Sequence, residues 1–483
     1  MKSIIFILLA CVFGVLIPNA PNSPDEAFIS QCLALVFLTN LVVFVIKLLQ
    51  PKPVNWLTVE VLFTVGFSLI HFGYFTYWIT GYFGTGQQLW NAGSVRVPHV
   101  VCQSVAMFGM VLNLFLAGYH LIKTKRFYPM INEVKPSRAV AKAWGTLGRI
   151  LVRIGFLCYL AFIVLVGPAV FFGNYAGTGN LSTTGNVFYQ LGQVLLVSGI
   201  TIGVVSRERF IASGRSKFSI LQIGFVDLFL VLITLAAIGI HGDRSTLLTV
   251  GVALAIAYSE YVKPFRMTVL IAGAFGVIFL IGLILINRSG RDVEFSFVDN
   301  LNHGMVNMGA SALCGFVAVE YAENNLSYGK KQILPLLGIM PFGRRLAGIT
   351  SNPDTSSAML FTLLIQGKTG RGVAGTGTSA FADFYLDFGL FGTSFLFLLL
   401  GFFSKWMENK ARHSTNILWQ VALVNFASFI AICSRYSIAG GLIRYVIYGV
   451  FYTVVISYLF GIPFKDKLTG DRAARTAFLR RNR

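Results

Sequence analysis

Arginines stand at the ends of several long apolar runs in this chain. Arg244 lies in a very tight connection, His-Gly-Asp-Arg-Ser-Thr, between two apolar runs, and Arg435 and Arg444 flank a short turn before the last run. Arg344 and Arg345 follow another apolar segment. A guanidinium binds phosphate through two parallel hydrogen bonds, and a cation this close to hydrocarbon needs an anion or water. These arginines are therefore the predicted phosphate-binding groups, and anchoring helix ends at a membrane surface is the alternative role.

Carboxylates and a histidine are the predicted proton-transfer groups. Asp383 and Asp387 begin an apolar run four residues apart, which places them on one face of a helix, with Tyr385 on another face. His303, Asp354 and Asp383 are the candidates for a general base, and the sequence does not rank them.

One further carboxylate, Asp227, lies near the middle of an apolar run, where a charge is costly. It is a candidate functional group whose partner the sequence does not identify, and a structural role is the alternative. The histidines show no HxxH or HExxH spacing, the six cysteines form no CxxC pair, and no DxD pair occurs. The sequence predicts neither a metal site nor a cofactor.

Membrane-spanning helices are the elements that must position these residues. Of the 483 residues, 55% are hydrophobic and 12% are charged, and the mean hydropathy is +0.71, which is well outside the range of soluble domains. The predicted spans are 4–17, 28–49, 54–80, 98–122, 150–172, 187–205, 218–240, 246–259, 267–286, 380–403, 416–433 and 441–461. We expect an all-α polytopic membrane protein, one integral domain over 1–483, with about twelve transmembrane helices and a range of about 11–14.

The distribution of positive charge predicts the orientation. The formal charge is +20, and the basic residues gather in alternate connections and in the tail 462–483, so these are expected to be cytoplasmic, as are both termini. The charge then reflects topology and contact with anionic lipids, so no nucleic-acid partner is expected. The first apolar run is also compatible with a signal peptide, which leaves the downstream orientation unchanged.

One connection on the opposite face, 287–379, is much longer than the others. A structureless loop of this length would be unusual, so we expect it to be helical in part. Its segments 305–322 and 333–342 are apolar enough to cross the bilayer, re-enter it or lie flat on it. Its last part, 370–379, is rich in glycine and either brings backbone N–H groups close to a ligand or forms a flexible loop before a helix cap.

Three of these features resemble the Wzy-type polymerases of O-antigen and other oligosaccharide repeat units. Gly242-Asp243-Arg244 resembles the family's Gly-x-Arg at the outer end of a span, and 375–392 resembles its glycine-rich entry into the span after the large outer loop. Arg435 and Arg444 resemble its late arginines. The architecture covers the whole chain, whereas the motifs are short, and the paired Arg-x(10)-Gly loop motif of some members is absent.

The resemblance implies a metal-independent glycosyltransferase with a glycosyltransferase type C-like fold in the bacterial inner membrane. It would polymerise undecaprenyl-pyrophosphate-linked repeat units at the periplasmic face, with lipid-linked donor and acceptor glycans, membrane lipids and a chain-length regulator protein as partners. The arginines would stabilise the pyrophosphate leaving group. The residues expected to contact glycan are Arg288, Arg291, Arg371 and Tyr385.

Two other functions remain open. O-antigen ligases carry a His-Asn pair near the start of the span that contains Gly389, where this chain has Thr378-Ser379. A flippase or transporter of lipid-linked oligosaccharide would usually show internal repeats with a site at mid-membrane, and no repeat is visible here. The sequence favours the polymerase over both.

Overall fold

The fold is helical throughout the part of the chain that can be described. The computed structural model describes residues 2–50, 54–79, 89–91, 96–122, 138–167, 183–211, 224–241, 243–276, 279, 311–337, 356–367, 377–414 and 416–464. Helix accounts for 85% of the structure, and no strand occurs among these residues. The prediction of an all-α protein is confirmed.

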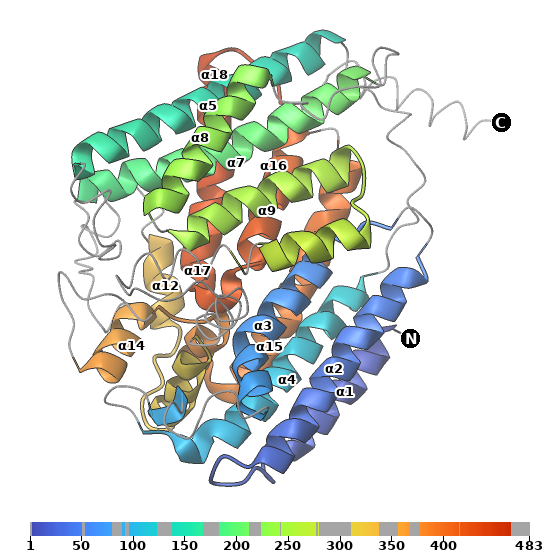
Figure 1. The fold of residues 1–483 in the computed structure, drawn as a ribbon, viewed down its shortest axis with the longest axis vertical. Coiled ribbons are helices and arrows are strands. Elements are labelled where there is room, and N and C mark those ends of the chain that lie inside the picture. The colour runs from blue at the N-terminus through green and yellow to red at the C-terminus, as the bar shows by residue number, and fades with distance from the viewer. Residues whose placement is uncertain are drawn as a thin grey trace.

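Figure 1 shows the described helices in chain order by colour, from blue at the N-terminus to red near the C-terminus. The first group is α1 Lys2–Leu16, α2 Glu26–Leu48, α3 Val59–Ile79, α4 Val101–Leu121, α5 Arg138–Val166, α7 Thr183–Ile211, α8 Phe225–His241 and α9 Arg244–Tyr261. The second group is Met267–Gly276, Ser311–Ala322, α12 Lys330–Leu337, α14 Ser357–Gln366, α15 Ala380–His413, α16 Ile417–Ile430, α17 Ile438–Gly441, η6 Leu442–Ile447 and α18 Tyr448–Leu459. Short 3-10 turns stand at Leu89–Asn91, Pro98–Val100 and Cys433–Arg435.

Seven of the described helical segments are long and apolar enough to cross a membrane. Every predicted span overlaps a described helix, but several of these helices are shorter than about 20 residues, the length that spans the hydrocarbon core. The central helix α16 has 14 residues and is almost entirely buried, so its apolarity reflects packing inside the bundle. The total of about twelve spans therefore stays a prediction.

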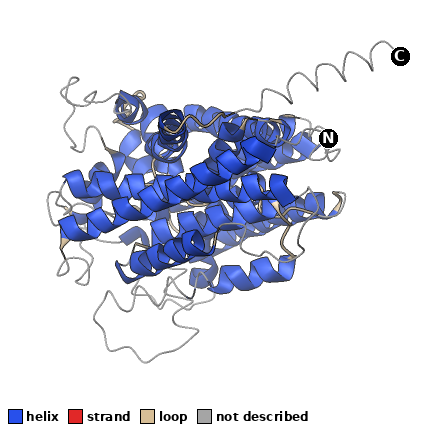
Figure 2. Cartoon of the chain, turned by 90° about the horizontal axis from the view of Figure 1, so that it is seen from above, coloured by secondary structure: helices blue, strands red, loops and turns tan. Residues whose placement is uncertain are grey.

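The helices run broadly side by side when the molecule is seen from above (Figure 2). In Figure 1, α12 and α14 lie on the left, whereas the chain begins on the right. We call the end that carries α12 and α14 the loop end, and the opposite end, where α1 begins, the N-terminal end. Helices α12, α14 and Ser311–Ala322 all belong to the 287–379 connection, and its described residues are indeed largely helical.

Small residues let the longest helices approach closely. A Cβ added to Gly118 on α4 would stand 1.9 Å from the carbonyl oxygen of Leu398, and one added to Gly401 on α15 would stand 1.9 Å from that of Phe115. Helices α5 and α7 meet in the same way through Gly148, Gly155, Gly192 and Gly199. Such contacts are typical of helices that associate in lipid, where packing replaces the hydrophobic effect.

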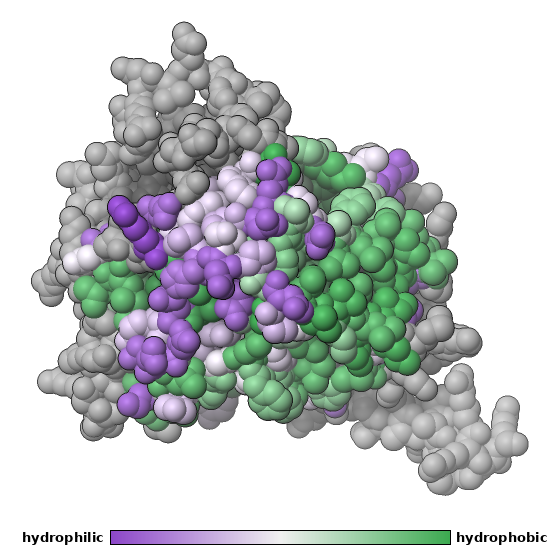
Figure 3. All heavy atoms as spheres, turned by 90° about the horizontal axis from the view of Figure 1, so that it is seen from below, coloured by the Kyte–Doolittle hydropathy of each residue, from purple (hydrophilic) through white to green (hydrophobic). Residues whose placement is uncertain are grey.

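The outer surface matches a lipid environment. Large apolar side chains such as Phe37, Leu49 and Phe391 are 71%, 79% and 88% exposed. Figure 3 shows a broad apolar surface beside a polar patch on the face seen from below. Exposed apolar area of this extent marks an interaction surface, and lipid is the surrounding that a bundle of apolar helices requires.

Candidate functional site

Arg444 lies in a π-helical turn, η6, at the start of the last predicted span. Its Nη2 donates a 2.6 Å hydrogen bond to Oε1 of Gln193 on α7, and Gln193 Nε2 donates to the Tyr445 hydroxyl at 3.2 Å. Its Nε is buried and has no hydrogen-bond partner among the described residues. π-Turns are rare and often occur at functional sites. This cation is thus held by a neutral amide and keeps unused hydrogen-bonding capacity.

Asp243 fixes the start of α9 beside this arginine. It caps the helix by accepting from the backbone N–H groups of Ser245 at 3.0 Å and Thr246 at 3.2 Å. It also accepts from the hydroxyls of Thr246 and Tyr189. Burial raises the pKa of Asp243, but the hydrogen bonds from Ser245, Tyr189 and Thr246 outweigh burial and hold the pKa below its ordinary value.

Arg244 is the first residue of α9, so the Asp243 cap sets its backbone position. The structure does not describe its side chain. Asp243 lies within the range of electrostatic interaction of Arg444. The start of α9 and Arg444 are therefore neighbours, although they are far apart in the sequence.

The turn between α16 and α17 connects this region to the start of α15. Tyr436 lies near Ser245 of α9, and Arg435 lies within electrostatic range of Cys314. The Arg435 carbonyl lies 3.8 Å from a Cβ placed on Gly377. Arg435, Arg444 and the backbone of Arg244 thus surround one region at the loop end. Their binding of a pyrophosphate stays a prediction.

Asp383 is fully buried in the first turn of α15. Its Oδ1 accepts a 2.8 Å hydrogen bond from the Thr378 hydroxyl. Ser357, Ser437 and Gln332 also face this carboxylate, whose Oδ2 forms no hydrogen bond of normal geometry among the described residues. Of the three proposed general bases, Asp383 is the one that the structure describes.

Asp387 shares a face with Asp383, as predicted, but it has a different set of partners. Its two oxygens accept the backbone N–H groups of Lys331 at 3.2 Å and Gln332 at 3.1 Å, so it caps the start of α12. Tyr385 is partly buried and stacks on Phe381 with ring centroids 5.3 Å apart. Asp387 holds α12 in place, and no sequence signal had indicated this pairing.

Asp227 is not in the middle of a helix as the apolar run predicted. Helix α8 begins at Phe225, so Asp227 lies in its first turn, and its Oδ1 accepts a 3.0 Å hydrogen bond from Arg153 Nε on α5. The apolar run extends upstream of the helix, which is why the sequence misplaced it. Asp227 therefore has an ion-pair partner, which the sequence had not identified.

Several predicted site residues lie outside the part of the chain that the structure describes. They are His303 and Asp354 among the general bases, Arg344 and Arg345 among the pyrophosphate ligands, and Arg288, Arg291 and Arg371 among the glycan contacts.

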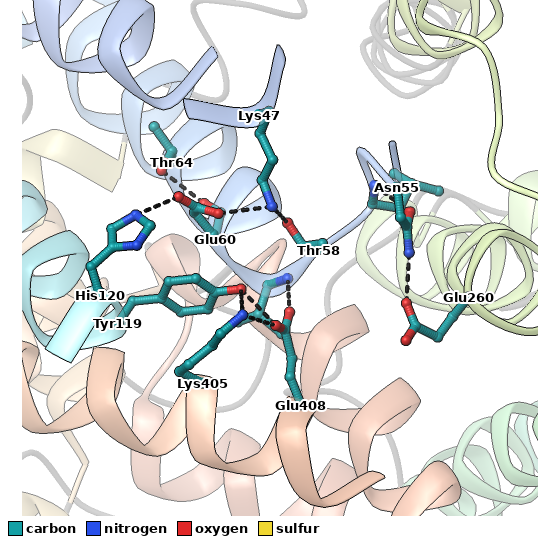
Figure 4. A network of polar contacts seen from close by, with 12 residues as sticks. Lys47, Asn55, Thr58, Glu60, Thr64, Tyr119, His120, Glu260, Lys405 and Glu408 are labelled. Carbon is teal, nitrogen blue, oxygen red and sulfur yellow. Dashed lines mark hydrogen bonds and ion pairs between the residues drawn. The ribbon is translucent and has the colours of Figure 1, made fainter. Parts of the chain in front are cut away.

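A second polar cluster lies at the N-terminal end of the bundle (Figure 4). Glu60 at the start of α3 is fully buried and pairs with Lys47 of α2 at 2.8 Å and with His120 of α4 at 2.7 Å. Glu408 of α15 accepts from the Tyr119 hydroxyl at 2.6 Å and from Lys405 at 3.2 Å. The two carboxylates thus tie together α2, α3, α4 and α15.

The same cluster reaches α9 and the backbone of α3. Glu408 also accepts the Val59 N–H at 2.9 Å, and Glu260 of α9 binds the guanidinium of Arg412 and Asn55 Nδ2. Lys47, Lys405 and Arg412 are thus paired inside helices, and not every basic residue that was counted for the orientation lies in a connection. Glu60, Glu260 and Glu408 each stand near the same end of a predicted span, and this pattern was the sequence signal for the cluster.

The described residues contain no group of three or more His, Cys, Asp or Glu side chains placed to hold a metal ion. The chain matches no protein-family model, no curated protein and no solved structure.

Proposed function

We propose that this protein polymerises undecaprenyl-pyrophosphate-linked oligosaccharide repeat units at the periplasmic face of a bacterial inner membrane. The observation that carries the proposal is Arg444, a cation in a π-turn whose guanidinium is bonded to a neutral amide and whose buried Nε has no partner among the described residues. A charge in this position needs an anion. A lipid-linked pyrophosphate brings one to this depth.

The surroundings of Arg444 suit a leaving group better than a bound carboxylate. Asp243 accepts hydrogen bonds from hydroxyl and backbone donors, and no ion pair joins it to Arg444 among the described residues. Arg435 adds a second cation on the adjoining turn. Fixed cations in a site of low dielectric stabilise charge that develops on a departing pyrophosphate without any reorganisation. A glycosyltransferase type C-like fold and cytoplasmic termini belong to the same proposal.

A ligase that transfers glycan to lipid A core would need a similar pyrophosphate site, and a flippase would need to bind the same lipid. The buried carboxylate Asp383 near the arginines supplies a base for a transfer reaction, which a flippase does not need. Thr378 and Ser379 occupy the place of the ligase His-Asn pair. Both features favour the polymerase.

Deletion of the gene in the producing bacterium separates the three functions. One repeat unit on each lipid A core supports polymerisation, whereas full-length polymer that remains on undecaprenyl pyrophosphate indicates a ligase. Precursor trapped at the cytoplasmic face indicates a flippase. Complementation with the wild-type gene should restore the polymer ladder, and a normal ladder in the deletion strain would rule out the proposal.

A further inference from the structure

Buried polar atoms without hydrogen bonds gather beside the start of α15. Asp383 Oδ2 and both polar side-chain atoms of Gln332 are buried and have no hydrogen-bond partner of normal geometry among the described residues. Leaving one such atom unpaired costs about 1–3 kcal/mol. Native proteins keep such atoms where a ligand or an ordered water supplies the missing bond. The unpaired atoms beside Asp383 can therefore accept hydrogen bonds from, or donate them to, a water or a polar ligand.

Four segments that are distant in sequence converge on this carboxylate. Gln332 comes from α12, Ser357 from the first turn of α14, and Ser437 from the cap of α17, and all three side chains lie close enough to Asp383 to interact with it, although none forms a bond of normal geometry to Oδ2. Thr378 donates to Oδ1 from the segment before α15. Hydroxyl and amide groups therefore surround Asp383.

Asp387 fixes the backbone of Gln332 and so places its side chain. The Asp387 carboxylate accepts the Gln332 N–H at 3.1 Å, and this bond ties the start of α12 to α15. Both Asp387 oxygens accept backbone N–H groups, and the described residues here include no group of three or more side chains placed to hold a metal ion. The groups that remain free to bind a ligand are one oxygen of the Asp383 carboxylate and the Gln332 amide, with hydroxyl groups around them.

A hydroxyl group fits these atoms better than an anion or a cation. A hydroxyl donates one hydrogen bond and accepts others, so it can donate to Asp383 Oδ2 and accept from Gln332 Nε2. An anion would be repelled by Asp383. A saccharide carries several hydroxyls and would also meet Gln332 Oε1.

We infer that Asp383 and Gln332 bind one hydroxyl of the acceptor saccharide, and that Asp383 takes its proton as the hydroxyl attacks. This inference rests on the proposed function. The acceptor oxygen forms a bond to the anomeric carbon of the donor, and the bond from that carbon to the pyrophosphate oxygen breaks. The pyrophosphate leaves with the electron pair, and the proton moves to Asp383 Oδ2. The Ser437 turn connects this carboxylate to Arg435, which lies two residues earlier.

Steady-state kinetics of the full chain in lipid nanodiscs tests the two roles separately. The substrate is the undecaprenyl-pyrophosphate-linked repeat unit extracted from the deletion strain. Asp383→Asn should lower kcat by about 100-fold or more, the usual contribution of a general base, with little change in KM. Gln332→Ala should raise the KM for the acceptor about tenfold, the effect of one lost hydrogen bond to a ligand.

The matched control is Gln420→Ala, near the start of α16. Gln420 is also buried, and its Nε2 donates to the carbonyls of Ala411 and Ser414. This variant should lose thermal stability without a change in KM. Equal KM changes in Gln332→Ala and Gln420→Ala, or wild-type kcat in Asp383→Asn, would overturn the inference.

A saccharide-binding measurement tests the site independently of polymerase activity. The probe is the oligosaccharide released from the lipid-linked unit by mild acid, and its contact with the protein is measured by saturation-transfer NMR. Wild type and Asp383→Asn should bind it, and Gln332→Ala should bind it more weakly. If wild type binds it but forms no polymer, the polymerase proposal falls and the saccharide site stands. If wild type does not bind it, the saccharide site falls.

Discussion

The guanidinium of Arg444 donates a 2.6 Å hydrogen bond to Gln193 on α7, so the cation of the π-turn is held by a residue without charge. A buried arginine that serves only to hold helices together is normally paired with a carboxylate. In this protein, the neighbouring Asp243 is engaged elsewhere. The bond to Gln193 therefore positions Arg444 without pairing it with a carboxylate.

Arg444→Lys should abolish or greatly shorten the polymer at normal expression. A lysine cannot bond Gln193 and present a second, parallel N–H to a phosphate oxygen, because its ammonium is a point charge. The loss of one charge-assisted hydrogen bond, about 1.5–3 kcal/mol, corresponds to a rate lower by about 10–100-fold. Polymer length on gels and the initial rate in nanodiscs measure the effect.

Arg149→Lys is the matched control, because Arg149 is exposed on α5 and bonds only within its own helix among the described residues. If Arg444 is merely an interfacial anchor, lysine replaces it well in both positions, since both side chains extend to the interface. Full-length polymer from Arg444→Lys would therefore refute the pyrophosphate role.

Asp243→Asn should destabilise the protein by about 1–3 kcal/mol and lower activity. Asparagine still caps α9, but it leaves a buried hydroxyl of Tyr189 or Thr246 without an acceptor. The pKa of Asp243 is depressed in the folded protein. Its stabilising contribution is thus complete above the unfolded pKa of about 3.9 and is lost as the pH falls through the lower folded pKa.

Thermal unfolding at several pH values measures this contribution. The difference in Tm between wild type and Asp243→Asn should be constant from neutral pH to about pH 5 and should shrink only below about pH 4. A difference that disappears between pH 5 and 7 would show that Asp243 titrates there and is not held by these hydrogen bonds.

The sequence predicts what depends on local periodicity. Apolar runs predicted the helices, and the four-residue spacing of Asp383 and Asp387 predicted their common face. It did not predict contacts between distant segments: the approach of Gln332 to Asp383, or the bond from Gln193 to Arg444. The ion pairs of Lys47, Lys405 and Arg412 were missed for the same reason. Counting charges along the chain cannot tell a loop cation from a buried one.

Glu408→Gln should destabilise the protein by about 3–5 kcal/mol, the cost of removing one partner from a buried ion pair. Lys405 would lose its carboxylate, and Tyr119 and the Val59 N–H would compete for one amide oxygen. Thermal unfolding in detergent is the measurement. Glu26→Gln, on the exposed first turn of α2, should change Tm little, and equal losses in both variants would contradict a structural role for the cluster.

Cysteine labelling in intact cells should place the loop end in the periplasm. Asn324→Cys, in an exposed turn between Ser311–Ala322 and α12, should react with an impermeant maleimide, and Lys263→Cys, exposed after α9, should not. The background should carry Cys11→Ser, because Cys11 is the native cysteine that is exposed in the structure. Labelling of Lys263→Cys alone would invert the orientation and move the proposed site to the cytoplasm.

Gly389→Ala should destabilise the protein by about 1–3 kcal/mol and reduce polymer formation. Gly389 interrupts α15 with φ +60° and ψ −165°, a conformation that is nearly confined to glycine. The break frees the Leu386 carbonyl, which a continuous helix would pair with residue 390, and this carbonyl instead accepts the Ser327 N–H at 2.8 Å. Ser327 leads into α12, so straightening α15 should displace Gln332 from Asp383.

Gly239→Ala is the control for this change, because Gly239 lies inside α8 with open space around its Cα. Alanine there should stabilise the helix by up to about 1 kcal/mol. The measurements are thermal unfolding and the KM for the lipid-linked acceptor. Gly389→Ala should lower Tm and raise KM, whereas Gly239→Ala should raise Tm and leave KM unchanged. If both substitutions raised Tm and left KM unchanged, the break in α15 would have no part in holding α12 at the site.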